Sequence, residues 1–81
     1  MTRFFARNEL AQFGAVVWED TLSQWNPKKN DVYVHHVGIM KADGDNTYRA
    51  IKRHYPSDSY EIVSGEQTLD DAVSVLVKTF S

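Results

Sequence analysis

Residues 68–81 read TLDDAVSVLVKTFS, and this stretch carries the clearest structural signal in the chain. Its apolar residues recur at the three- and four-residue spacing of a helix with one core-facing stripe. They are Leu69, Ala72, Val73, Leu76, Val77 and Phe80. Thr68 can cap such a helix, with Asp71 at the third position of a capping box. Asp70 and Asp71 at its start and Lys78 near its end suit the helix dipole. We therefore predict a helix that packs one face on a sheet.

Two stretches in the middle of the chain predict strands of that sheet. Residues 32–41 are rich in β-branched and aromatic residues, which strands favour. Alternation places apolar side chains on both of their faces, so this strand should be well covered. Residues 59–64 form a shorter strand, with Tyr60 and Ile62 on one face and Glu61 and Val63 on the other.

Residues 47–55 lie between these strands, and their pattern is ambiguous. As a strand they would pair with residues 32–41 through residues 42–46, whose Asp-Gly and Asp-Asn steps tolerate tight turns. As a helix they would stack Tyr48, Ile51 and Tyr55 on one face. We favour the strand, because a five-residue turn suits a hairpin.

Residues 9–25 fit a helical wheel. The stripe consists of Leu10, Phe13, Val17, Thr21 and Trp25. Asn8 is a candidate cap, and Asn26-Pro27 would end the helix, because the residue before proline avoids the α region. Gly14 and the strand-forming run Val16-Val17-Trp18 weaken this interpretation. An extended conformation of residues 12–19 therefore stays open.

The expected fold is a single compact α+β domain over residues 1–81. The expected order is α-β-β-β-α, a three-stranded antiparallel sheet with two helices on one face, which buries both apolar stripes. If residues 47–55 are helical, the order becomes α-β-α-β-α. We find no repeat, linker or low-complexity tract in the sequence.

The order α-β-β-β-α resembles that of the double-stranded-RNA-binding domain. The resemblance covers most of the chain, but only as an order of elements. That family contacts backbone phosphates with the basic start of its last helix. Here the start reads Glu66-Gln-Thr-Leu-Asp-Asp71, whose carboxylates would repel phosphates. We therefore do not extend RNA binding to this chain on the basis of element order.

Composition narrows the class of protein. Hydrophobic residues make up 42% and charged residues 25% of the 81 residues, which is typical of a folded globular protein. There is no cysteine, so disulfides and thiolate metal sites are excluded, and a cytoplasmic location is expected. No apolar run approaches the roughly 20 residues that cross a bilayer, so we expect no membrane association. Met1 to Asn8 lack the apolar stretch of a signal peptide.

Chemical motifs give no sign of catalysis or of a cofactor. The sequence lacks the spacings of phosphate-binding loops, dinucleotide-binding turns, zinc proteases and nucleophile elbows. His35 and His36 would point to opposite faces of their strand and cannot share a metal ion. His54 could join one of them across a hairpin, but no carboxylate stands at a ligand spacing. We expect no enzyme, no cofactor and no metal.

The stretch Tyr48-Arg-Ala-Ile-Lys-Arg-His-Tyr55 is the strongest candidate for nucleic-acid binding. On a strand, Arg49 and Arg53 would share one face with Ile51 and Tyr55, while Lys52 and His54 would share the other with Tyr48. Such a surface could follow phosphates and stack a base. The candidate residues are Tyr48, Arg49, Lys52, Arg53 and Tyr55. The commoner explanation of such charges is an edge strand protected from aggregation.

A non-enzymatic protein-binding module is the function we favour, with nucleic-acid binding as the alternative. The net charge is −2, and the negative charge gathers in the last third of the chain. The candidate partner-binding residues are Asp58, Glu61, Glu66, Asp70 and Asp71. Such an acidic end would dock on a basic surface. Small inhibitors made by phages and mobile elements, such as anti-CRISPR proteins, have this profile.

Overall fold

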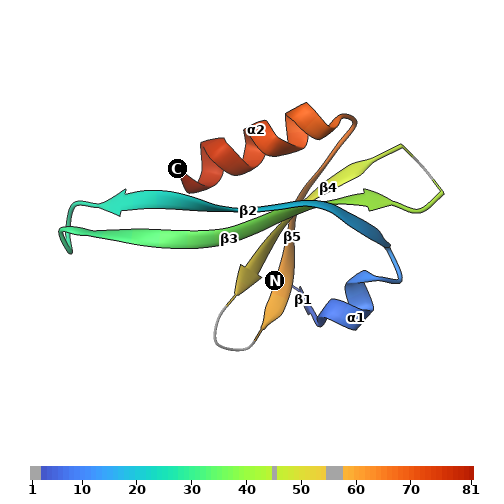
Figure 1. Ribbon diagram of the computed structural model, residues 1–81, viewed down its shortest axis with the longest axis horizontal. Helices are drawn as coiled ribbons and strands as arrows, with labels where there is room; N and C mark the ends of the chain where they lie inside the picture. The colour runs from blue at the N-terminus through green and yellow to red at the C-terminus, as the bar shows by residue number, and fades with distance from the viewer. Residues whose placement is uncertain (1–2, 45, 55–57) are drawn as a thin grey trace.

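A computed structural model describes residues 3–44, 46–54 and 58–81, and its strands form one antiparallel sheet (Figure 1). The elements follow one another as β1 (Phe4–Phe5), α1 (Arg7–Leu10), β2 (Gly14–Asn26), β3 (Asp31–Ala42), β4 (Tyr48–His54), β5 (Ser59–Glu66) and α2 (Leu69–Phe80). The strand order across the sheet is β1-β5-β4-β3-β2. The long strand β2 and the two-residue strand β1 are therefore its edges.

The two helices cover opposite faces of this sheet (Figure 1). On the face under α2, the buried core consists of Val37, Ile39, Ala50, Ala72 and Leu76. On the other face, beside α1 and β1, it consists of Phe5, Leu10, Met40, Ile51 and Tyr60. The prediction of three strands with two helices on one face is wrong, and so is the alternative order α-β-α-β-α. Because the observed element order differs, the resemblance to the double-stranded-RNA-binding domain does not hold.

The error lies in residues 9–25, which were expected to form a helix. Only Arg7–Leu10 are helical, and Gly14–Asn26 form a 13-residue strand that pairs with β3 along its whole length. The strand preference of Val16, Val17 and Trp18 outweighs the helical spacing of the apolar residues, and pairing with β3 stabilises the strand further. Asn8 lies inside α1, whose cap is Ala6, with the Glu9 carboxylate accepting the Ala6 N–H at 2.9 Å.

The other predicted elements are confirmed. Residues 32–41 and 59–64 fall on β3 and β5, Tyr48–His54 form β4, and the three strands pair antiparallel as expected. The expectation that residues 32–41 are well covered is wrong for Val32, Tyr33 and Val34, which are exposed. Helix α2 begins after Thr68, whose hydroxyl accepts the Asp71 N–H at 3.1 Å. Its stripe is narrower than predicted, because Leu69 and Val77 are exposed. In the described parts of the chain, no helix has the length and apolar character needed to span a bilayer.

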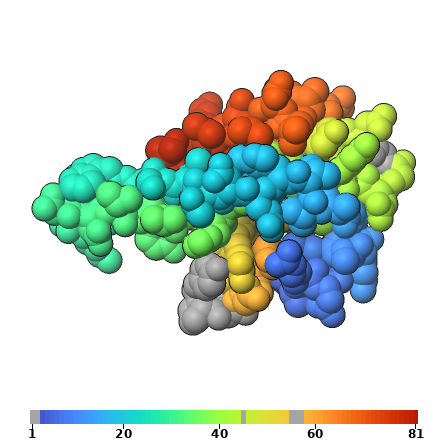
Figure 2. Space-filling view, in the orientation of Figure 1, coloured from blue at the N-terminus to red at the C-terminus, as the bar shows by residue number. Residues whose placement is uncertain are grey.

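Strands β2 and β3 continue beyond the rest of the sheet as a two-stranded hairpin. Pairing of β3 with β4 begins at His36, whereas β2 and β3 stay paired out to Asn26 and Asp31. We call residues 22–35 the arm. It projects as a narrow ribbon from the rest of the molecule (Figure 2). The whole molecule, with the arm, measures 44 × 27 × 23 Å. Phe80, near the end of α2, packs at the base of the arm against His35.

Candidate functional site

Large apolar side chains stand exposed on the arm. Trp25 is 56% exposed and Tyr33 58% exposed, and Val32 and Val34 are each 48% exposed. Trp25 and Val32 are directly opposite one another, and Val34 follows two residues later on β3, so these three share one face. Tyr33 lies on the other face, the one that α2 covers. The arm therefore presents an apolar surface that the described residues leave uncovered.

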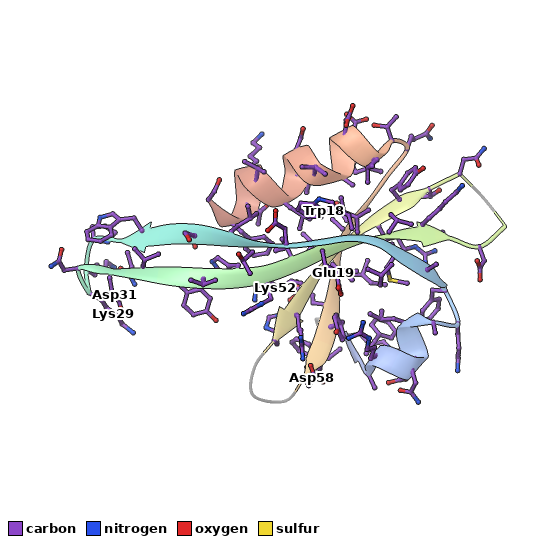
Figure 3. All side chains as sticks on the ribbon, in the orientation of Figure 1. Trp18, Glu19, Lys29, Asp31, Lys52 and Asp58 are labelled. Carbon is purple, nitrogen blue, oxygen red and sulfur yellow. The ribbon has the colours of Figure 1, made fainter. Side chains whose placement is uncertain are left out.

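The turn at the tip of the arm is held by local hydrogen bonding. The side-chain oxygen of Asn26 accepts the Lys28 N–H at 3.1 Å, which is the geometry of an Asx turn. Asn30 adopts a positive φ of 51°, a conformation that asparagine tolerates. Lys29 and Asp31 lie at the far end of the ribbon (Figure 3), so the tip carries both signs of charge.

The outer edge of β2 is less suited to pairing with another strand. A β-bulge between Val16 and Trp18 breaks its regular register. Glu19 and Asp20 follow directly, and the Asp20 carboxylate accepts the Thr21 N–H at 2.8 Å. Bulges and charges of this kind are the devices by which proteins protect edge strands. The arm's apolar face, rather than the β2 edge, is the more open surface.

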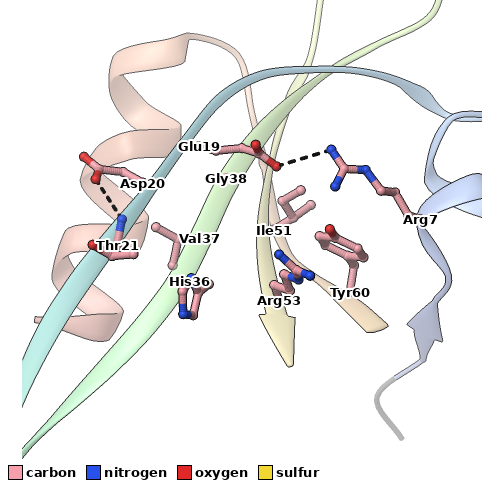
Figure 4. Close-up of a pocket in the computed structure, with 10 residues that line it drawn as sticks. All are labelled: Arg7, Glu19, Asp20, Thr21, His36, Val37, Gly38, Ile51, Arg53 and Tyr60. Atoms are coloured by element: carbon pink, nitrogen blue, oxygen red, sulfur yellow. Dashed lines mark hydrogen bonds and ion pairs between the residues drawn. The ribbon is translucent and has the colours of Figure 1, made fainter. Parts of the chain in front are cut away.

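A hollow of about 250 Å³ lies beside the arm, on the face that α1 covers (Figure 4). Gly38 and Ile51 lie in it, with His36, Arg53 and Tyr60 around them. Its two arginines each have a carboxylate partner. Arg7 Nη2 lies 4.0 Å from Glu19 Oε1, and Arg53 pairs with Asp58 at 2.5 Å. The lining of the hollow therefore carries charges of both signs and little net charge.

Lys52 is the unexpected feature of the other face, because it is only 5% exposed. Its Nζ donates to the backbone oxygen of Arg53 at 2.8 Å. The ring centroids of Tyr33 and Phe80 lie 5.9 and 6.0 Å from Nζ. Among the described residues, no carboxylate oxygen comes within 4.0 Å of it. Buried lysines are rare unless they are paired, so this side chain requires an explanation.

Lys52 borders a groove of about 450 Å³ between the arm and the end of α2. The groove is lined by Gln24, Trp25, Asn26, Pro27, Tyr33, His35, Lys52, His54 and Phe80. His35 Nε2 bonds the Gln24 side-chain oxygen at 2.9 Å, while its Nδ1 is buried without a partner in the described chain. His54 Nε2 lies 3.1 Å from Glu61 Oε1. We call this space the Lys52 groove.

Burial sets the electrostatics of the groove. It lowers the pKa of Lys52, and the nearby Glu61 carboxylate opposes that shift. Burial also lowers the pKa of His35, and the positive charge of Lys52 and of His54 lowers it further. Both shifts disfavour positive charge in the groove, and burial is the larger cause of each. Within the residues that the structure describes, no group of three or more His, Asp or Glu side chains could hold a metal ion.

The structure separates the predicted acidic residues. Asp58 and Glu61 lie at the start of β5, and Glu66 lies at its far end, on the order of 20 Å away at about 3.3 Å per residue. Asp70 and Asp71 are in the first turn of α2. Asp58 is paired with Arg53 and Glu61 with His54. The five carboxylates do not form one patch, and their part in binding stays a prediction.

The predicted nucleic-acid residues also diverge. Arg49 lies over the Phe13 ring at 5.7 Å on the α1 side of the sheet, whereas Lys52 is buried on the α2 side. Arg53 pairs with Asp58, and Tyr48 packs under α2. Tyr55 lies outside the described residues. The strand alternation was predicted correctly, and it is what divides these cations between two faces.

Sequence reasoning missed the arm and the Lys52 groove. It placed Trp25 on the apolar stripe of a helix and read Lys52 as a surface cation. The signal for the arm was Asn26-Pro27 followed by residues 28–30, a turn sequence between two strand-forming stretches.

Comparison with known proteins gives no further guide to the site. No protein-family model, characterised protein sequence or solved structure matches this chain significantly.

Proposed function

We propose that this chain is a non-enzymatic protein-binding module that docks through the apolar face of its arm. The observation that carries the proposal is the exposure of Trp25, Val32 and Val34 on one face of a projecting two-stranded ribbon. Clustered exposed apolar side chains are typical of interaction surfaces. Tryptophan in particular is enriched among the residues that dominate binding energy.

The form of the arm supports docking. A two-stranded ribbon is marginally stable in water by itself, and residues 3–44, 46–54 and 58–81 leave one face of the arm exposed beyond its base. A partner that buries Trp25 and its neighbours would stabilise the ribbon as well as gain apolar contact. The hollow beside the arm, with Arg53 and Tyr60, would extend the contact area on the same face.

Charge favours a protein partner over nucleic acid. The arm carries Lys28 and Lys29 against Asp31, and Glu19 and Asp20 stand near its base. Phosphate binding needs several uncompensated cations along one surface, and such a surface is missing from the arm. An inhibitor of the phage or mobile-element kind is one form that a protein-binding module of this size could take.

The test compares the arm with the opposite end of the same strand. The arm variant carries Trp25→Ser, Val32→Thr and Val34→Thr, and the control carries Val16→Thr and Val17→Thr, which are also exposed. Each purified protein is immobilised, and nuclease-treated extract of the producing cell is passed over it. Bound proteins are quantified by mass spectrometry, and circular dichroism checks that each variant is folded.

We expect one protein to bind the wild type and the control equally and to bind the arm variant at least about tenfold less, the effect of removing a single strong contact. Equal capture by all three chains would contradict docking through the arm. Capture from a parallel extract without nuclease, together with no capture from the treated extract, would favour the nucleic-acid alternative instead.

A further inference from the structure

We propose that the Lys52 groove binds a small organic anion, a carboxylate or phosphate attached to one aromatic ring. The site lies where the arm leaves the rest of the sheet (Figure 3), on the face of Tyr33 and Phe80, and Trp25 is among the residues that line it. It does not depend on the proposed protein-binding function.

No carboxylate oxygen of the described residues lies within 4.0 Å of the ammonium of Lys52. Taking an ammonium group out of water is costly unless a negative charge or several hydrogen bonds replace the water. Nζ has three protons to donate, and within the described chain one of them goes to the Arg53 carbonyl oxygen at 2.8 Å. An anion in the groove would accept the others and balance the charge.

The carboxylate that stands across the sheet from Lys52 pairs with another side chain. Glu61 stands opposite Lys52 in the β4–β5 pairing, but its Oε1 lies 3.1 Å from His54 Nε2. Glu61 therefore pairs with His54, and the ammonium of Lys52 lies instead near the rings of Tyr33 and Phe80. These rings border the groove, so its open volume lies on the side of Lys52 where an anion would complete its contacts.

The groove also offers a wall of rings for the body of the ligand. Tyr33, His35 and Phe80 form a run of ring contacts, with centroids 4.5 and 4.8 Å apart. Flat apolar groups pack well on such a wall. The groove volume of about 450 Å³ falls within the range of small-molecule sites. His35 Nδ1, buried and without a partner in the described residues, adds a polar atom beside this wall.

The test uses benzoate and phenyl phosphate as probes, with benzamide as an uncharged ligand of the same shape as benzoate. Binding is followed by the backbone amide NMR signals of the full chain. The variant is Lys52→Met, which replaces a buried charge with an apolar side chain of similar length and should leave the fold intact. The control is Lys41→Met, an exposed lysine on the neighbouring strand.

We expect at least one anion to shift the signals of Lys52, Tyr33 and Phe80 saturably, and benzamide to bind about tenfold or more weakly, as charge-assisted hydrogen bonds imply. Lys52→Met should lose this binding and Lys41→Met should keep it. Equal binding of benzamide and benzoate, unchanged binding by Lys52→Met, or no binding of either anion at about 10 mM would each overturn the proposal.

Discussion

Gly14 passes so close to Lys41 that a Cβ carbon on Gly14 would lie 2.0 Å from the Lys41 carbonyl oxygen. The two residues are one position apart in the register of β2 and β3, at the point where the chain enters the long edge strand. Glycine is the one residue that permits this approach without displacing backbone. The same contact determines where the hairpin that ends in the arm begins.

Gly14→Ala should therefore destabilise the protein by about 1–3 kcal/mol, the usual cost of overpacking, since β2 must move away from β3. Gly65→Ala is the matched control, because a Cβ there would meet only Thr47 Cγ2 at 3.6 Å, an ordinary contact. Urea denaturation of both variants measures the difference. Equal stability of the two would show that β2 does not enter the sheet as described.

Leu76→Ala should cost about 2–5 kcal/mol, because Leu76 is fully buried between α2 and the sheet. Val77→Ala, one residue along, should cost less than about 1 kcal/mol, because Val77 is 42% exposed. Thermal and urea unfolding of the two variants give the comparison. A similar loss in both would mean that α2 presents a different face to the core.

Lowering the pH should remove the part of the free energy of unfolding that depends on a neutral His35. Burial and the positive charge of Lys52 hold the pKa of His35 below its ordinary 6.5 in the folded protein. The unfolded chain therefore takes up this proton first as pH falls, and stability present above about pH 6.5 is lost below it. Relative to His35→Gln, the wild type should lose free energy of unfolding between about pH 6.5 and pH 5. A constant difference across this range would contradict the assignment.

Local signals predicted β3, β4, β5 and α2, because each is decided by residues close in sequence: strand-forming runs, a turn and a capped apolar stripe. Strand β2 could not be read this way. Its bulge between Val16 and Trp18 interrupts the alternation of a strand, so the remaining apolar residues fell by coincidence on a helical spacing. Pairing with β3 decides its conformation, and away from the turn this pairing joins residues as far apart in the sequence as Gly14 and Ala42.

The candidate site was harder to predict than the fold. Alternation correctly separated Lys52 and His54 from Arg49 and Arg53, but it could not show that Lys52 is buried. That burial depends on Phe80 from α2 and Tyr33 from the arm, which the tertiary structure brings together. The exposure of Trp25 depends likewise on the arm projecting beyond β4.

Site-specific photo-crosslinking in the producing cell tests the docking face most directly. A photoreactive amino acid replaces Val34, on the apolar face of the arm, or Val17, equally exposed at the other end of the same hairpin. If the chain binds a protein through its arm, irradiation should join position 34 to one discrete protein, and position 17 should give little or none of that product. Crosslinking from position 17 but not from position 34, or adducts with nucleic acid alone, would contradict the account.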